Sequence, residues 1–198
     1  MIDTLHRLCA RGRSEAVWRQ YEVTERGYVL ANLHRPAVVD DPARLLAVMG
    51  ALDDVARRVP VLFLAHPRTR ARLTETALPL PPFLRLLEPM SYTDFVALEA
   101  GARIVITDSG GVQEETSALG VPCLTYRTTT DRPITVQLGT NRVVGVDPRA
   151  LLHSALDELD RPFPAGRAPI PLWDGRAGQR AARAVAAFLA TDATTPAR

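Results

Sequence analysis

Residues 108–115 carry the clearest signal for chemistry in this sequence. The segment Asp-Ser-Gly-Gly-Val-Gln-Glu-Glu follows an apolar run and precedes a helical pattern. Gly110 and Gly111 allow the backbone to approach an anion closely, and Ser109 adds a hydroxyl donor to the unpaired N–H groups of a helix start. These groups suit a phosphate or a pyrophosphate. The alternative is a tight turn whose glutamates only interact with the helix dipole.

Two carboxylates end this segment, and they need a role of their own because a carboxylate beside a phosphate repels it. One of them can accept hydrogen bonds from ribose hydroxyls, as the acidic residue of a dinucleotide-binding fold does. Glu115 follows Gly111 by four residues, so the two lie on one face of the helix. The segment therefore predicts a nucleotide ligand.

Histidine and arginine side chains follow other apolar runs. His34 and Arg35 end the first run, and such a pair can donate to a phosphoryl oxygen or act as an acid; the alternative is a plain strand end. His66 ends the second run in the same way. Arg127 and Arg132 bracket a threonine-rich loop, which either binds phosphate or is simply solvated.

The elements that must position these residues alternate along the chain. Six short apolar runs, rich in Val, Leu and Ile, are typical of parallel strands covered on both faces. These runs are Tyr28–Leu33, Val61–Ala65, Leu84–Leu87, Arg103–Thr107, Cys123–Tyr126 and Arg142–Val146. Helical patterns cover Pro42–Val59 and about residues 68–77, 91–100, 110–119, 134–138, 148–159 and 175–190. This alternation predicts an α/β fold, a doubly wound parallel sheet whose ligand binds at the carboxyl ends of the strands.

Composition excludes several classes of function. The 198 residues include 24 basic side chains, all of them Arg, against 22 acidic ones, so the formal charge of +2 gives no basic stripe for nucleic acid. No signal peptide begins the chain and no run is long enough to span a membrane. The four histidines lack metal-ligand spacing. Two cysteines cannot form a disulfide framework, so we expect a soluble cytoplasmic protein without a metal.

Several motifs together resemble the non-hydrolysing UDP-N-acetylglucosamine 2-epimerases. They are LHRP at 33–36, HPRTR at 66–70, EPMSYTDF at 88–95, TDSGGVQEE at 107–115, LGVPCL at 119–124, TTDRP at 129–133, GTNRVVG at 139–145 and WDG at 173–175. The family fold consists of two Rossmann-like domains in a GT-B-type architecture. The resemblance implies that residues 1–190 are the C-terminal, UDP-binding domain, that the terminal helix crosses over, that 191–198 form a frayed tail, and that the N-terminal catalytic domain is absent.

The resemblance also implies roles for individual residues. Ser109, Gly110 and Gly111 would hold the diphosphate, with His34 and Arg132 nearby and His34 on the side of the leaving group. Glu115 would accept from the ribose hydroxyls, and the Met90 backbone and the Phe95 ring would contact uracil. Arg35, His66 and Arg127 are further candidates for substrate binding. The family reaction eliminates UDP, inverts C2 and adds UDP back, and it uses no cofactor.

Some residues depart from the family pattern. Ala37 and Val38 replace an acidic and an amide side chain, while Asp131 and Ile134 shorten or remove carboxylates. The family's acid and base carboxylates lie in the other domain. Expected partners are therefore a UDP-sugar, a separate N-terminal half and a second copy of the chain. The alternatives are a non-catalytic UDP-sugar-binding module and the donor-binding domain of a glycosyltransferase.

The terminal helix bears on these partners. Val185, Phe188 and Leu189 lie among many alanines there. We expect them to form a partly exposed apolar strip that is available for association.

Overall fold

One parallel sheet of six strands organises the chain. The structure is a computed structural model that describes residues 1–9, 15–75, 80–164 and 169–192. The strands are β1 (Val29–Asn32), β2 (Val61–Leu64), β3 (Arg85–Leu87), β4 (Ile104–Thr107), β5 (Cys123–Thr125) and β6 (Asn141–Val143). Their order is β3-β2-β1-β4-β5-β6, and every neighbouring pair is parallel. The predicted doubly wound sheet is confirmed, and this order is that of the Rossmann fold.

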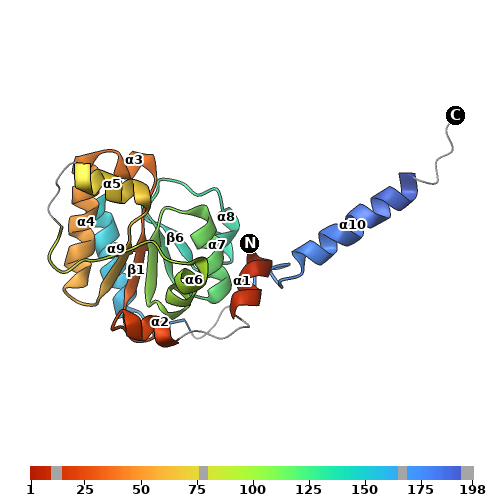
Figure 1. The fold of residues 1–198 in the computed structure, drawn as a ribbon, viewed down its shortest axis with the longest axis horizontal. Coiled ribbons are helices and arrows are strands. Elements are labelled where there is room, and N and C mark those ends of the chain that lie inside the picture. Colours follow the sequence, from red (N-terminus) through yellow and green to blue (C-terminus); the bar gives the residue numbers. More distant parts are fainter. Residues whose placement is uncertain (10–14, 76–79, 165–168, 193–198) are drawn as a thin grey trace.

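Helices lie on both faces of the sheet (Figure 1). They are α1 (Ile2–Cys9), α2 (Glu15–Gln20), α3 (Pro36–Val39), α4 (Pro42–Ala56), α5 (Pro67–Glu75), α6 (Tyr92–Gly101), α7 (Gly110–Leu119), α8 (Pro133–Gln137), α9 (Pro148–Asp160) and α10 (Ala177–Asp192). The last seven correspond to predicted helices, although residues 76–77 of the expected 68–77 helix lie outside the described residues. The sequence around His6 has a helical pattern, which agrees with α1, whereas α2 and α3 had not been indicated as separate elements.

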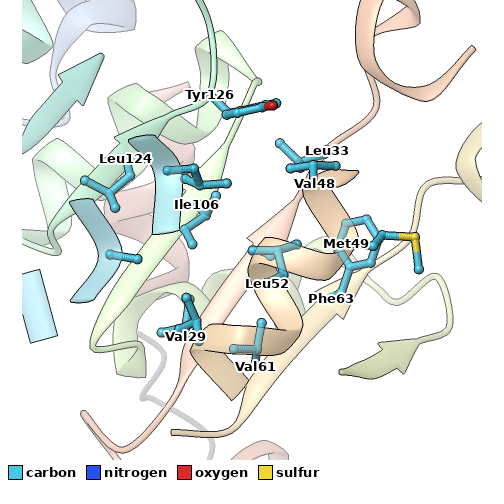
Figure 2. Packing of buried hydrophobic residues seen from close by; sticks show 14 of the residues in the cluster. Val29, Leu33, Val48, Met49, Leu52, Val61, Phe63, Ile106, Leu124 and Tyr126 are labelled. Carbon is cyan, nitrogen blue, oxygen red and sulfur yellow. The ribbon is translucent and has the colours of Figure 1, made fainter. Parts of the chain in front are cut away.

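Alternating residues of the strands contribute to two apolar cores, one on each face of the sheet. Val29 and Ala31 of β1 face a cluster with α3, α4, α5 and α9, whereas Leu30 faces a cluster with α2, α6 and α7. Figure 2 shows the first cluster, where Leu52 of α4 lies among side chains of β1, β2 and β4. Because both faces of the sheet are covered, the central strand positions are apolar on both sides, which explains the short apolar runs in the sequence.

Local signals fix the ends of the principal helices. Asp41 begins α4 by accepting hydrogen bonds from the N–H groups of Ala43 and Arg44, and Pro42 occupies the first helical position. Gly120 ends α7 in the left-handed conformation, at a φ of 72°. The α7 helix therefore starts where the chain leaves β4 and ends at Gly120.

The last helix extends away from the body of the molecule (Figure 1). The Asp3 carboxylate of α1 accepts hydrogen bonds from the N–H groups of Ala177 and Gly178 at 3.2 and 2.8 Å, and so caps α10. Val185, Phe188 and Leu189 are 57%, 65% and 60% exposed, which confirms the predicted apolar strip. The predicted tail begins later than expected, because α10 continues to Asp192; residues 193–198 lie outside the described residues.

Among the described residues, no helix has both the length and the apolar character needed to cross a membrane.

Two glycines allow a matched test of this backbone. Gly50 lies inside α4 and Gly120 has a positive φ, and a Cβ at either position would meet no atom within 4 Å. Gly50→Ala should raise the free energy of unfolding by about 1 kcal/mol, since alanine favours helix. Gly120→Ala should lower it by about 1–2 kcal/mol, since a Cβ disfavours the left-handed region. Urea denaturation measures both changes in the free energy of unfolding. Changes in the same direction would contradict the role of Gly120 at the end of α7.

Candidate functional site

The turn from β4 into α7 leaves a set of donors exposed to a ligand. The Ser109 N–H donates to Thr107 Oγ1 at 3.0 Å, which fixes the turn. The Ser109 hydroxyl makes no capping bond to α7, and the first-turn amides of Gly110 and Gly111 precede the first intrahelical bonds. A hydroxyl and several amides therefore converge at the positive end of a helix, an arrangement that binds an anion.

Asp108 joins the end of β4 to the end of β1. Its fully buried carboxylate accepts from the N–H groups of His34 at 3.0 Å and Arg35 at 2.8 Å. His34 Nδ1 lies 2.9 Å from Asp108 Oδ1, and Arg35 Nε donates to the Asp108 carbonyl oxygen at 2.9 Å. A carboxylate here favours a proton on Nδ1, so Nε2 of His34 is the nitrogen left for a ligand.

His66 lies beside this pair. Its ring centroid is 5.6 Å from that of His34, so the structure brings both predicted histidines to one edge of the sheet. Nδ1 of His66 accepts from the N–H of Arg68 at 3.3 Å. Each ring is therefore oriented through its Nδ1.

Arg132 reaches the same edge from the loop after β5. Its Nε lies 2.9 Å from Glu114 Oε1, so Glu114 holds the guanidinium beside the start of α7. Thr130 Oγ1 accepts from the Arg132 N–H at 2.9 Å and donates to Gln113 Oε1 at 2.5 Å. Gln113 is fully buried, so the loop that carries Arg132 is joined to the buried side of α7.

Arg127 has a different environment from the one expected. Its Nη1 lies 2.6 Å from Asp131 Oδ1, and this hydrogen bond holds the pKa of Asp131 below its usual value. A Cβ at Gly110 would stand 3.5 Å from the same oxygen. Arg127 thus neutralises a carboxylate next to the turn from β4 into α7.

Glu115 lies one turn further along α7. It is 5% exposed, and the Tyr92 hydroxyl of α6 donates a hydrogen bond to its Oε1. Burial raises the pKa of Glu115. Met90 and Phe95, partly buried, pack against the second core cluster on either side of the start of α6. The arrangement offers an acceptor for a diol next to an apolar surface.

Sequence reasoning missed some members of this site. Tyr92 carries no signal, because a tyrosine in the first turn of a helix is ordinary. Glu114 and Gln113 stand inside the recognised motif, but their partners lie on a loop far along the chain. Within the described ranges, no cluster of three or more His, Cys, Asp or Glu side chains could hold a metal ion.

A pocket of about 620 Å³ adjoins this edge without containing the anion-binding groups. Ala37, Val38, Tyr126 and Thr128 contribute to its lining. Two of the four positions that depart from the family pattern, Ala37 and Val38, therefore face this neighbouring space.

Comparisons with known proteins agree with the geometry. Residues 1–186 match the family model described as UDP-N-acetylglucosamine 2-epimerase. The enzyme of that name from Methanocaldococcus jannaschii is 34% identical over 167 residues, covering 81% of this chain and 45% of the relative. A Pseudomonas aeruginosa UDP-2,3-diacetamido-2,3-dideoxy-D-glucuronate 2-epimerase is 35% identical over 139 residues, covering 70% and 39%.

A solved structure is similar in fold as well. The crystal structure of the Methanocaldococcus jannaschii enzyme in complex with UDP-GlcNAc and UDP superposes with a TM-score of 0.78 at 31% identity, over 93% of this chain and 52% of that one. The chain thus spans about half the length of the relatives it matches. It belongs to the UDP-N-acetylglucosamine 2-epimerase family.

Proposed function

We propose that this chain is the UDP-binding half of a non-hydrolysing UDP-N-acetylglucosamine 2-epimerase. The observation that carries the proposal is the uncapped Ser109 hydroxyl at the start of α7, with the Glu115 carboxylate one turn away. Together they match a diphosphate followed by a ribose. The bound UDP-GlcNAc and UDP of the Methanocaldococcus jannaschii structure support this assignment.

The diphosphate would lie at the turn. Ser109 Oγ and the amides of Gly110 and Gly111 would donate to its oxygens, and Arg132 would approach from the loop after β5. Eliminating UDP from the sugar places negative charge on the phosphate oxygen that leaves. Donors fixed before the reaction stabilise such a developing charge at little cost in reorganisation.

The nucleoside would extend along α6 and α7. Glu115 would accept from the ribose hydroxyls, Phe95 would lie against the uracil ring, and the Met90 backbone would meet its edge. Partial burial of Met90 and Phe95 next to the second core supports this placement.

His34 would stand on the side of the departing phosphate. Asp108 orients its ring, so Nε2 would donate to, or take a proton from, the leaving group. The carboxylates that remove and return the C2 proton would come from an N-terminal half, as the family resemblance implies. His66 and Arg35 would support the same edge.

The sugar and the partners are further parts of the proposal. UDP-N-acetylglucosamine is the proposed substrate, and UDP-N-acetylmannosamine the product. The partner would be an N-terminal half, and the exposed strip of α10 would also allow a second copy to associate. Two cysteines are too few for a disulfide framework, which supports a reducing compartment, and we propose the cytoplasm.

UDP binding is the direct test. Ser109→Ala and Glu115→Ala should each weaken UDP binding about tenfold or more, because each removes a hydrogen bond that involves a charged group. Isothermal calorimetry on the purified chain measures the dissociation constants. Ser154→Ala on α9, which makes the same chemical change away from the site, should leave the affinity unchanged. Wild-type affinity in both site variants would sink the assignment.

Activity should require the other half of the architecture. The purified chain should form no UDP-N-acetylmannosamine from UDP-N-acetylglucosamine, because no donor or acceptor for C2 is proposed on it. Adding the N-terminal half of a relative should give turnover. Chromatography of the nucleotide sugars measures it. Product formed by the chain alone would show that its own residues perform the proton transfer at C2.

A further inference from the structure

Glu99 on α6 is a buried carboxyl that the proposed mechanism leaves unused. Its side chain is fully buried, and among the described residues neither carboxyl oxygen has a hydrogen-bond donor. An ionised carboxylate in such a place costs several kcal/mol unless a partner compensates it. The sequence places it amid apolar neighbours, so its presence needs a physical reason.

The partner of Glu99 is Glu115. The two carboxyls lie within hydrogen-bonding reach across the contact between α6 and α7. Tyr92 stands two turns before Glu99, on the same face of α6, and donates a hydrogen bond to Glu115 Oε1. Glu115 is therefore held between a hydroxyl and a second carboxyl.

Two ionised carboxylates cannot share this position, because neither can donate to the other. One proton between them resolves the conflict, since the protonated carboxyl then donates to the ionised one. Glu99 is the more deeply buried of the two, so it is the member that keeps the proton. Burial, followed by the charge of Glu115, raises the pKa of Glu99 well above its usual value.

The titratable groups that interact with Glu99 include Tyr28, Tyr92 and Cys123, none of which carries a positive charge. Tyr28 of β1 donates its hydroxyl to the Leu98 carbonyl, and burial raises the pKa of the Cys123 thiol of β5 to about 12. On the Glu115 side lie Glu114, the amino terminus and Tyr92, and Cys9 of α1 faces Tyr92. The charge of the amino terminus acts to lower the pKa of Glu115, which agrees with Glu115 carrying the negative charge.

We propose that Glu99 is a positioning residue for the nucleotide site, and that its carboxyl donates a shared proton to Glu115. This bond fixes one oxygen of Glu115 and leaves the charged carboxylate aimed at the ribose hydroxyls. The ribose role rests on the proposed function, whereas the shared proton rests on the burial of Glu99, on its interaction with Glu115 and on the contact between α6 and α7.

The shared proton has a consequence for stability. The pKa of Glu99 is higher in the folded chain than its ordinary value of 4.5. The stabilising contribution is therefore complete below that ordinary value and is lost as the pH rises through the folded value. Glu99→Gln keeps a hydrogen-bond donor but cannot ionise. It therefore removes this loss of stability at higher pH.

The experiment compares Glu99→Gln, Glu99→Leu and the control Glu75→Gln, an exposed glutamate of α5 paired with Arg72. Urea denaturation from about pH 5 to about pH 9 should show the midpoint of Glu99→Gln rising relative to wild type as the pH increases. The Glu75→Gln midpoint should run parallel to wild type. Infrared spectroscopy near neutral pH should detect a protonated carboxyl in wild type and in Glu75→Gln, and its loss in Glu99→Gln.

Calorimetry with UDP tests whether Glu99 positions Glu115 for the nucleotide. Glu99→Gln should bind UDP within about twofold of wild type, and Glu99→Leu should bind about tenfold more weakly, because it leaves Glu115 without that donor. A protonated carboxyl that persists in Glu99→Gln, or that is absent from wild type, would overturn the shared proton. Wild-type affinity in Glu99→Leu would overturn the positioning role.

Failure of the proposed function gives a different pattern. If the wild-type chain does not bind UDP, the ribose role is refuted, while the infrared and denaturation results still decide whether Glu99 and Glu115 share a proton. If Glu99→Leu does not fold, the pH dependence of Glu99→Gln and its infrared spectrum decide the same point.

Discussion

The buried carboxylate of Asp108 is the constraint on which the functional edge depends. It binds the backbone of residues 34 and 35 and stands against the His34 ring, so it fastens the carboxyl end of β4 to that of β1. The register Asn32↔Thr107 brings these ends level. This is also the point where the strand order reverses and the chain connections diverge to either side. Such a reversal leaves a crevice at the carboxyl ends of the strands. The Asp108 carboxylate lies at the base of this crevice and joins the two strands.

A second set of polar contacts extends this rigidity to the loop that carries Arg132. Asn141 Nδ2 donates to Gln113 Oε1 at 3.1 Å and to Thr135 Oγ1 at 3.0 Å, and its own oxygen accepts from Thr125 Oγ1 at 2.6 Å. The anion-binding helix, β5, β6 and α8 thus share one buried network. Buried networks of this kind favour a single arrangement, because a displacement would break several buried hydrogen bonds at once. The site is built before a ligand arrives.

The sequence was most informative where packing is simplest. Apolar runs such as Ile104–Thr107 can only be strands buried on both faces, and the polar residues that follow them must meet at one edge. Short helices were missed because α3 is a single turn whose apolar residues, Val38 and Val39, continue the core of its neighbours. Glu99 could not have been interpreted from its neighbours in sequence, because its environment is created by a helix that begins eleven residues later. Arg127 was a further candidate for substrate binding, and its ion pair with Asp131, on the same loop, could not be read from the sequence pattern.

The cap on α10 has a mechanical consequence. Asp3 belongs to α1, which packs against both α6 and α7, the helices that carry Tyr92 and Glu115. The hydrogen bond from Gly178 is the main reason that the pKa of Asp3 is lowered, so the joint stays charged into acidic solution. A displacement of the projecting helix would therefore be transmitted to α6 and α7 through α1, which holds the start of α10 by Asp3 and the Trp173 carbonyl before it by His6.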